Sequence, residues 1–197
     1  MEYLKKIIGN VDIYLIDQIL KERYRLEDTI LDAGCGSGRN LKWFYNNDIN
    51  FYGVDVFKEQ LKIAKEQYPL KKNNLLLNAI EELSFESEKF HHIICNAVLH
   101  FAESTTHFKI MFAELVRVLK PKGSLFIRMS STIGFENFVR PISNGIYKLP
   151  DDNNYFLLTR ELLTELMKTH NLSFLEPLKT VIVNDTRTMS TLVLAKM

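Results

Sequence analysis

The chain contains 197 residues, of which 46% are hydrophobic and 25% are charged. A chain of this size can bury a substantial core in one domain, and it leaves no room for a second full domain. The 25 Lys and Arg residues and the 24 Asp and Glu residues give a net charge of +1, so the chain lacks the broad positive field that supplies most non-specific affinity for nucleic acid. We therefore expect residues 1–197 to form a single domain that does not act on nucleic acid.

The N-terminal segment and the cysteine content predict a cytoplasmic protein. Glu2, Asp12 and Asp17 interrupt the apolar residues near the N-terminus, so neither a signal-peptide core nor a membrane span is predicted there. Cys35 and Cys95 are too few for a disulfide framework, and the sequence has no CxxC motif and no Cys/His cluster with the spacing of a zinc site. We expect a reducing compartment and no bound metal.

Helical and strand-like patterns alternate along the first two thirds of the chain. Apolar positions between residues 11 and 20 follow a helical period, which predicts an N-terminal helix ending near Tyr24 and a helical cap over residues 1–27. Short apolar runs then alternate with amphipathic segments, as in βαβ units of a parallel sheet. The predicted strands cover residues 29–34, 50–55, 74–78, 90–96 and 124–130, and the predicted helices cover residues 39–46, 58–68 and 105–119.

The last third of the chain is less regular. The sequence KPKG at residues 120–123 predicts a turn before the fifth strand. Residues 131–154 contain two prolines, two glycines and the cluster PDDNN, which predict a loop or lid, with or without a short helix. A helix is predicted over residues 159–170, and two β-rich runs at residues 172–184 and 188–197 predict a hairpin at the sheet edge.

A glycine-rich turn follows the first predicted strand, in the sequence ILDAGCGSGRN from Ile30 to Asn40. Glycines let the backbone turn tightly and approach a ligand closely, and the unpaired N–H groups at the start of the next helix favour a carboxylate. A dinucleotide-binding turn, GxGxxG, has its third glycine five residues after the first. That position is Arg39 here, and the spacing is instead GxGxG, with Asp32 two residues before the first glycine.

This pattern resembles motif I of the class I S-adenosylmethionine-dependent methyltransferases. The resemblance implies a Rossmann-like α/β fold, with a seven-stranded, mostly parallel sheet, helices on both faces and a C-terminal antiparallel hairpin strand. It also implies S-adenosyl-L-methionine as cofactor, with its methionine half held by Asp32, Gly34, Cys35, Gly36, Gly38 and Asn40. A structural turn or another nucleotide-binding loop is the alternative for this motif taken alone.

Asp55 ends the second predicted strand, 17 residues after Gly38. Its carboxylate can accept hydrogen bonds from both hydroxyls of a ribose. It can also cap the helix that begins near Lys58, and the two roles are compatible. Val56 or Phe57 would then flank the adenine, because an apolar or aromatic side chain suits the face of a purine ring; Phe57 as an ordinary core residue is the alternative.

Two further matches follow the third and fourth predicted strands. Asn78, Ala79 and Ile80 occupy the place where the family commonly has an acid that binds the adenine amino group. The Asn78 amide oxygen can accept the same bond, and an ordinary loop asparagine is an equal alternative. The sequence FHHIICNAVLHF at residues 90–101 resembles motif IV of the family, which implies that Asn96 and Ala97 lie beside the methionine part of the cofactor.

Recognition of the methyl acceptor is expected beyond the carboxyl ends of the strands, where open α/β sheets bind ligands. His100 follows Asn96 closely and is the candidate for a base or an acceptor contact, with a capping or solvent-facing histidine as the alternative. The acceptor candidates are Tyr14, His100, Phe101, Arg128, Phe135, Arg140 and Tyr147.

The resemblance implies a monomer or homodimer that transfers a methyl group to a small molecule by in-line displacement. More narrowly, the chain resembles small stand-alone bacterial members related to the tellurite-resistance and thiopurine-type methyltransferases. The alternatives are a protein or RNA methyltransferase and a non-catalytic module that binds S-adenosylmethionine. Cys35 and Cys95 end strands that we expect to be neighbours, and two buried side chains are favoured there over a reversible disulfide.

Overall fold

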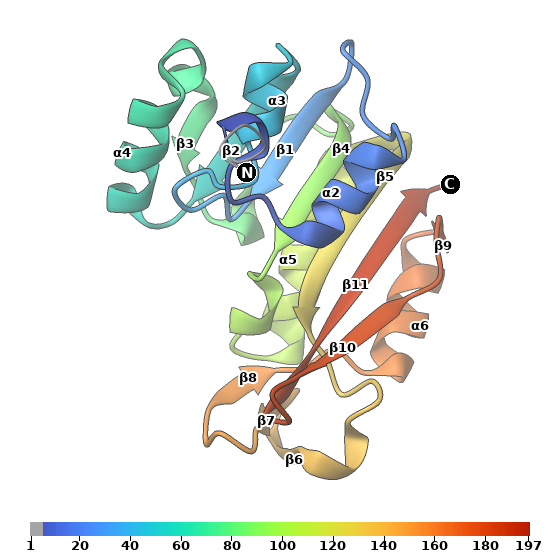
Figure 1. Ribbon diagram of the computed structural model, residues 1–197. Helices are drawn as coiled ribbons and strands as arrows, with labels where there is room; N and C mark the ends of the chain where they lie inside the picture. Colours follow the sequence, from blue (N-terminus) through green and yellow to red (C-terminus); the bar gives the residue numbers. More distant parts are fainter. Residues whose placement is uncertain (1–5) are drawn as a thin grey trace.

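The computed structural model describes residues 6–197 and is organised around a central β-sheet (Figure 1). Its strands are β1 (Thr29–Ala33), β2 (Asn50–Asp55), β3 (Leu75–Leu77), β4 (Phe90–Asn96), β5 (Leu119–Ser130), β9 (Leu172–Phe174), β10 (Lys179–Val183) and β11 (Arg187–Lys196). They lie in the order β10-β11-β5-β4-β1-β2-β3, and β9 also pairs with β11. Neighbours from β3 to β5 are parallel, whereas β11 is antiparallel to β5, β9 and β10. The mostly parallel sheet with an antiparallel C-terminal strand pair is therefore confirmed, but in the described residues it has eight strands rather than the predicted seven.

Helices cover both faces of this sheet, as predicted (Figure 1). They are α2 (Ile13–Leu20), α3 (Lys42–Asn46), α4 (Lys58–Gln67), α5 (Thr105–Val118) and α6 (Arg160–Thr169). Leu15 of α2, Phe44 of α3 and Leu61 of α4 belong to one buried apolar cluster. Phe108 of α5 and Leu163 of α6 belong to a second cluster. Because side chains alternate between the two faces of a strand, the sheet separates these two cores and supplies apolar residues to each.

The N-terminal helix and the helix after the glycine-rich turn are both shorter than predicted. The first ends at Leu20 rather than near Tyr24, because Tyr24 leaves the helix to pack edge-on against Phe44, with ring centroids 5.0 Å apart. The second begins at Lys42 rather than at residue 39, because hydrogen-bonded turns occupy the preceding residues. The predicted cap over residues 1–27 includes residues 1–5, which lie outside the described part of the chain.

Two predicted strand boundaries also differ. Residues 120–123 belong to β5 and form an irregularity in it rather than a separate turn, since Phe90 pairs with Leu119 while His92 pairs with Ser124. The run at 172–184 divides into β9 and β10, which pair with different parts of β11 on either side of Pro177, a residue without an N–H for the ladder.

Residues 131–154 are more regular than the predicted loop. Together with the two residues after them they contain the short helix η4 (Glu136–Phe138) and the strands β6 (Arg140–Ser143), β7 (Ile146–Lys148) and β8 (Asn154–Phe156), which form a three-stranded antiparallel sheet. This small sheet lies below the ends of β4 and β5 in Figure 1. It has a small core of its own, formed by Phe135, Val139, Leu149 and Leu157. In residues 6–197 no helix is long and apolar enough to cross a membrane.

Candidate active site

A cavity of about 460 Å³ lies at the carboxyl ends of β1, β2, β3 and β4. This is the edge of an open parallel sheet where ligands bind, and the volume suits a small molecule or cofactor. Residues after each of these strands contribute to the wall, and two residues of α5 complete it. The lining residues are Gly34, Asp55, Val56, Phe57, Asn78, Ile80, Glu81, Asn96, Ala97, Val98, Phe101, His107 and Met111.

The glycine-rich turn after β1 depends on residues without a side chain. Gly34 has a φ of +79°, and a Cβ at this position would lie 2.2 Å from Cγ2 of Val98. Gly38 has a φ of +85°, and a Cβ there would lie 2.6 Å from the ring of Tyr68. The Tyr68 hydroxyl also donates a hydrogen bond to the Gly38 carbonyl oxygen at 2.8 Å. Positive φ and close packing together require glycine at both positions.

Asp55 ties the end of β2 to the glycine-rich turn. One carboxylate oxygen accepts a hydrogen bond from the Gly36 N–H at 2.7 Å, and the other accepts one from the Phe57 N–H at 2.9 Å. A carboxylate has about four lone-pair positions, so Asp55 can accept further hydrogen bonds from a ligand in the cavity that it lines. Val56 and Phe57 are both more than half exposed at the same rim and present apolar surface for a flat ring.

Asp32 and Asn96 carry buried polar atoms that have no partner among residues 6–197. Both carboxylate oxygens of Asp32 and both polar atoms of the Asn96 amide are in this state. Burial, opposed by the charge of Arg39 and assisted by that of Asp55, raises the pKa of the Asp32 carboxyl to about 7. Asn96 lines the cavity, and Asp32 lies two residues before Gly34, which also lines it. Buried polar groups are normally hydrogen-bonded, so unpaired groups at this place indicate a ligand with matching donors and acceptors. A cationic ligand group would stabilise the Asp32 carboxylate.

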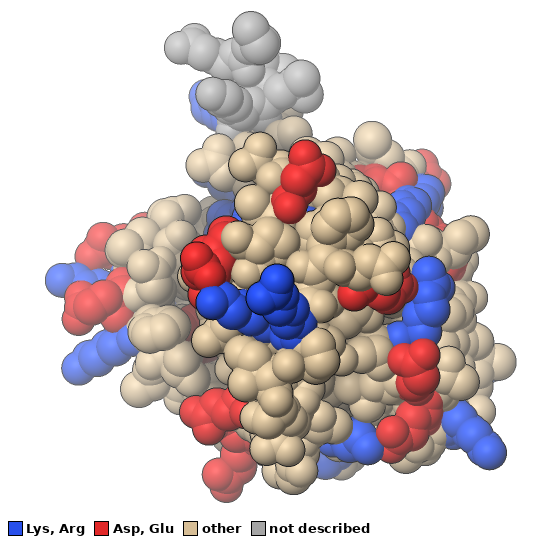
Figure 2. Space-filling model, turned by 90° about the horizontal axis from the view of Figure 1, so that it is seen from below, with Lys and Arg blue, Asp and Glu red and all other residues tan. Residues whose placement is uncertain are grey.

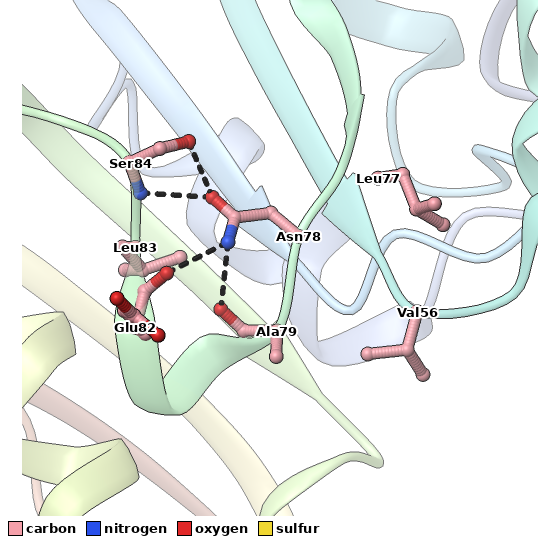
Figure 3. Close-up of a pocket in the computed structure, with 7 residues that line it drawn as sticks. All are labelled: Val56, Leu77, Asn78, Ala79, Glu82, Leu83 and Ser84. Atoms are coloured by element: carbon pink, nitrogen blue, oxygen red, sulfur yellow. Dashed lines mark hydrogen bonds between the residues drawn. The ribbon is translucent and has the colours of Figure 1, made fainter.

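Asn78 lines the cavity, but its amide is already paired within its own loop (Figure 3). The amide oxygen accepts hydrogen bonds from the N–H and the hydroxyl of Ser84, at 2.8 and 2.7 Å. The amide nitrogen donates to the carbonyl oxygens of Ala79 and Glu82. Figure 3 shows the amide pointing toward this loop and away from Val56. This arrangement corresponds to the alternative in which Asn78 is an ordinary loop asparagine. Other residues of the cavity wall would then contact an adenine.

Several residues assigned to the cofactor by sequence lie outside the cavity wall. The Cys35 side chain is buried in one apolar cluster and its N–H bonds to the Val54 carbonyl oxygen, so neither faces a ligand. Cys95 is buried in the other cluster, and the two thiols are free. The Asn40 amide oxygen instead accepts a hydrogen bond from the Asp12 N–H at 3.2 Å. Gly36 and Gly38 shape the turn, and Ala79 lines an adjoining surface pocket.

A second pocket, of about 280 Å³, lies beside the first, and Ala97 lines both. Ala97 follows β4 and has a φ of 62°, a conformation that is uncommon outside glycine and concentrated at functional sites. Besides Ala97, which was assigned to the cofactor, sequence analysis named two members of this second pocket as acceptor candidates, His100 and Arg128. The full lining is Ala97, His100, Arg128, Ser130, Tyr155, Val183, Arg187 and Met189. Tyr155 and Arg187 were missed because they come from distant elements, β8 and the start of β11.

His100 is 8% exposed, and its Nδ1 atom has no hydrogen-bond partner among the described residues. Its ring lies close to those of Phe101 and Tyr155, with centroids 4.5 and 5.3 Å away. Burial, with a further contribution from the charge of Arg187, lowers the pKa of His100 to about 4. The imidazole is therefore neutral at pH 7 and one of its nitrogens is available as an acceptor.

The remaining acceptor candidates lie in other places. Phe101 lines the first cavity, and the Tyr14 ring on α2 lies 5.0 Å from the Arg128 guanidinium. Phe135 is buried in the small core next to the three-stranded sheet, and Tyr147 packs against that core. Arg140 lines a separate surface pocket on the same sheet. Phe135, Arg140 and Tyr147 are thus outside both pockets, and Tyr155 of β8 is the residue by which the three-stranded sheet borders the second pocket.

The cavity is lined by the Asp55 carboxylate, the unpaired Asn96 amide and an exposed apolar rim, and the unpaired Asp32 carboxylate is buried two residues before Gly34 of the same wall. A family model agrees with this geometry. The model, described as a methyltransferase domain, matches residues 31–127, from β1 into β5. The chain belongs to the class I S-adenosylmethionine-dependent methyltransferases. S-adenosylmethionine is accordingly the cofactor that this family implies for the cavity.

The most similar sequences and structures include proteins of this family. An uncharacterized protein of Methanocaldococcus jannaschii is 33% identical over 167 residues, which cover 85% of this chain and 75% of that protein. A tRNA (carboxymethyluridine(34)-5-O)-methyltransferase of Arabidopsis thaliana is 35% identical over 98 residues, which cover 50% of this chain but only 23% of that protein. An S-adenosylmethionine-dependent methyltransferase structure from Methanosarcina mazei has a TM-score of 0.72 at 17% identity, covering 91% of this chain and 97% of that one. The last similarity shows a shared fold.

Proposed function

We propose that this methyltransferase acts on a small molecule, which binds in the pocket around His100 while the cofactor occupies the larger cavity. The observation that carries the proposal is the meeting of two separate pockets at Ala97. Methyl transfer needs a donor and an acceptor held next to each other, and orientation of this kind can lower a barrier by roughly 7–11 kcal/mol.

The residues around the larger cavity fit S-adenosylmethionine. The unpaired, buried carboxylate of Asp32 and the unpaired Asn96 amide suit the ammonium and carboxylate groups of its methionine half. The spare lone pairs of Asp55 suit its ribose hydroxyls, and Val56 and Phe57 suit its adenine ring.

When bound, S-adenosylmethionine supplies an electrophilic methyl group. A bond then forms between the acceptor heteroatom and the methyl carbon while the methyl–sulfur bond breaks, and the sulfur keeps the electron pair. A proton on the heteroatom leaves to solvent or to a nearby base. The chain itself needs to position the acceptor and exclude water, and the buried ring of His100 and the wall at Ala97 serve that purpose.

RNA is the second candidate acceptor, because one relative is a tRNA methyltransferase. The net charge of +1 argues against it. Figure 2 shows the molecule from below, with basic and acidic side chains interspersed among neutral ones over the described part of this face. That part of the face has no continuous stripe of Lys and Arg side chains that could follow a phosphate backbone.

Calorimetric titration with S-adenosylmethionine and S-adenosylhomocysteine tests the cofactor half of this proposal. We expect both ligands to bind to the wild-type chain and Asp55→Ala to weaken binding by roughly 10- to 100-fold, the effect of losing hydrogen bonds to a charged group. Glu66→Ala, at an exposed position of α4, serves as the matched control and should leave affinity unchanged. Absence of binding to either ligand would remove the proposal.

The acceptor half is tested by methyl transfer to a panel of small thiols, amines, alcohols and carboxylic acids, run beside unmodified tRNA. Turnover of a small molecule supports the proposal. Turnover of tRNA alone would contradict the proposal and favour RNA as the acceptor.

A further inference from the structure

The pocket around His100 has an unusual balance of charge. Arg128 and Arg187 are its charged lining residues, and neither Asp nor Glu belongs to the lining. His100 is neutral, as described above. The pocket, of about 280 Å³, is therefore lined by two cationic side chains and by no anionic one.

The two arginines differ in how their charge is balanced. Arg128 lies 3.4 Å from the Asp12 carboxylate of α2, an ion pair on the side of the N-terminal helix. Its Nε atom is buried and has no partner among the described residues. Arg187 forms no ion pair within residues 6–197, and it lies near enough to His100 to lower the pKa of that ring. The charge of Arg187 is thus not balanced by an ion pair among the described residues, and Arg128 has an unused N–H donor.

The polar lining also contains a buried imidazole, whose neutral ring has one donor and one acceptor nitrogen. His100 is more than nine-tenths buried, and its Nδ1 atom is unpaired. With one donor group on Arg128, a free guanidinium on Arg187 and an acceptor on His100, the wall is suited to a molecule with an anionic end and an N–H or O–H group. Guanidinium groups bind carboxylates in a bidentate geometry, which gives such a site directional specificity.

We propose that the methyl acceptor is a small molecule bearing a carboxylate, bound by Arg187 with Arg128, whose N–H or O–H group is positioned by His100. This inference rests on the proposed function, because the pocket is an acceptor pocket only if the adjoining cavity holds the cofactor. It narrows the acceptor from any small molecule to an anionic one. Ala97, which borders both pockets, places the acceptor next to the donor.

Binding of benzoate to the protein saturated with S-adenosylhomocysteine provides the direct test, with neutral benzamide as the matched ligand. NMR spectra of the ¹⁵N-labelled histidine rings report the His100 environment. We expect benzoate to shift the His100 signals saturably and benzamide to leave them unchanged. Arg187→Ala should weaken benzoate binding about tenfold or more, and Arg187→Lys should restore part of it. Arg140→Ala is the control, because that arginine lies in a different pocket.

Methyl transfer to small hydroxy and amino carboxylic acids, compared with their primary amides, is the second arm. A preference for the acids over the amides supports the proposal if Arg187→Ala abolishes that preference. In this variant the KM for the acids should rise while the affinity for S-adenosylmethionine stays unchanged. Equal use of acid and amide, or no shift of His100 with benzoate, overturns it while the cofactor titration leaves the proposed function standing. Loss of cofactor binding in the wild-type chain would instead overturn both.

Discussion

At the level of single residues, Asp32 is the group whose environment differs most from that of an ordinary carboxylate. It is buried near the end of β1, its oxygens have no partner among the described residues, and burial raises its pKa to about 7. A folded-state pKa above the ordinary value of 3.8 means that this carboxyl favours the folded state at low pH. That contribution is lost as the pH rises through about 7. In the cofactor-free protein the ionised Asp32 carboxylate therefore lowers the free energy of unfolding.

The variant Asp32→Asn should separate stability from binding. An uncharged amide is less costly to bury than a carboxylate, so we expect the cofactor-free variant to have a Tm about 4 °C or more above wild type at pH 8. The gain should shrink toward pH 5. Affinity for S-adenosylmethionine should fall by at least roughly tenfold. Thermal melts and calorimetry measure the two effects, with Glu66→Gln as control. A variant that melts lower and binds normally would contradict this role for Asp32.

The sequence patterns point to some residues of the candidate site and not to others. Asp32, Asp55 and Asn96 stand next to the glycine turn or at predicted strand ends. In the structure Asp55 and Asn96 line the cavity, and Asp32 is buried two residues before Gly34, which also lines it. The Asn78 amide turns into its own loop because Ser84, six residues later, supplies two donors. Arg187 could not be found, because only the antiparallel insertion of β11 beside β5 brings it to His100, and no local pattern records that pairing.

At the level of elements, the segment after β5 shows why short strands are hard to predict from sequence. Its strands have three or four residues, too few for an alternating pattern to be visible, and Pro141 and Gly145 lie within or between them. The chain turns at Gly145, where φ is +84° and a Cβ would lie 2.3 Å from the Phe156 ring. By contrast, strands β2 and β4, with six and seven residues, have the bounds that the sequence predicted.

Glu176, which lies between β9 and β10, connects helix α2 to the edge of the sheet that ends with β10. Its carboxylate accepts hydrogen bonds from Gln18, Lys21, Arg23 and Lys179. Burial alone would raise the pKa of Glu176, but these bonds outweigh it and hold the pKa at about 2. A depressed folded-state pKa stabilises the fold above the unfolded pKa of about 4.3, and this stability is lost as the pH falls toward 2.

Substitution of Glu176 by glutamine should destabilise the protein by about 2 kcal/mol at pH 7, because hydrogen bonds to a charged acceptor are replaced by weaker ones. The difference from wild type should stay constant down to about pH 5 and then diminish as the wild-type carboxylate is protonated. Urea denaturation at several pH values measures it. Glu165→Gln, which breaks an exposed pair with Lys109, is the control and should cost less than about 1 kcal/mol. A pH-independent difference would contradict this account of Glu176.

At the level of the whole molecule, the order of the parallel strands follows from the alternation of apolar runs and amphipathic segments between residues 29 and 130. Right-handed crossovers permit few alternatives for such a chain. The same alternation places the carboxyl ends of β1, β2 and β4 together, and the cavity lies there. What the sequence could not supply is how the C-terminal third folds against this frame and forms one side of the second pocket.

Filling the larger cavity should stabilise the molecule as a unit. S-adenosylhomocysteine at 100 times its Kd would add about 2.7 kcal/mol to the free energy of unfolding. For a chain of this length that corresponds to a rise in Tm of about 5–11 °C. Thermal melts at increasing ligand concentration measure the shift, with adenosine alone expected to give less of it. An unchanged Tm at saturating ligand would contradict the assignment of the cavity.

The turn at Ala97 gives the two pockets a common wall, with a φ of 62° that few residues adopt. Any movement of this turn when one pocket fills alters the shape offered to the occupant of the other. Thermodynamic linkage then requires reciprocity: the factor by which the cofactor changes acceptor affinity equals the factor by which the acceptor changes cofactor affinity. A substitution at position 97 should accordingly change this shared coupling free energy, a quantity that belongs to neither pocket alone.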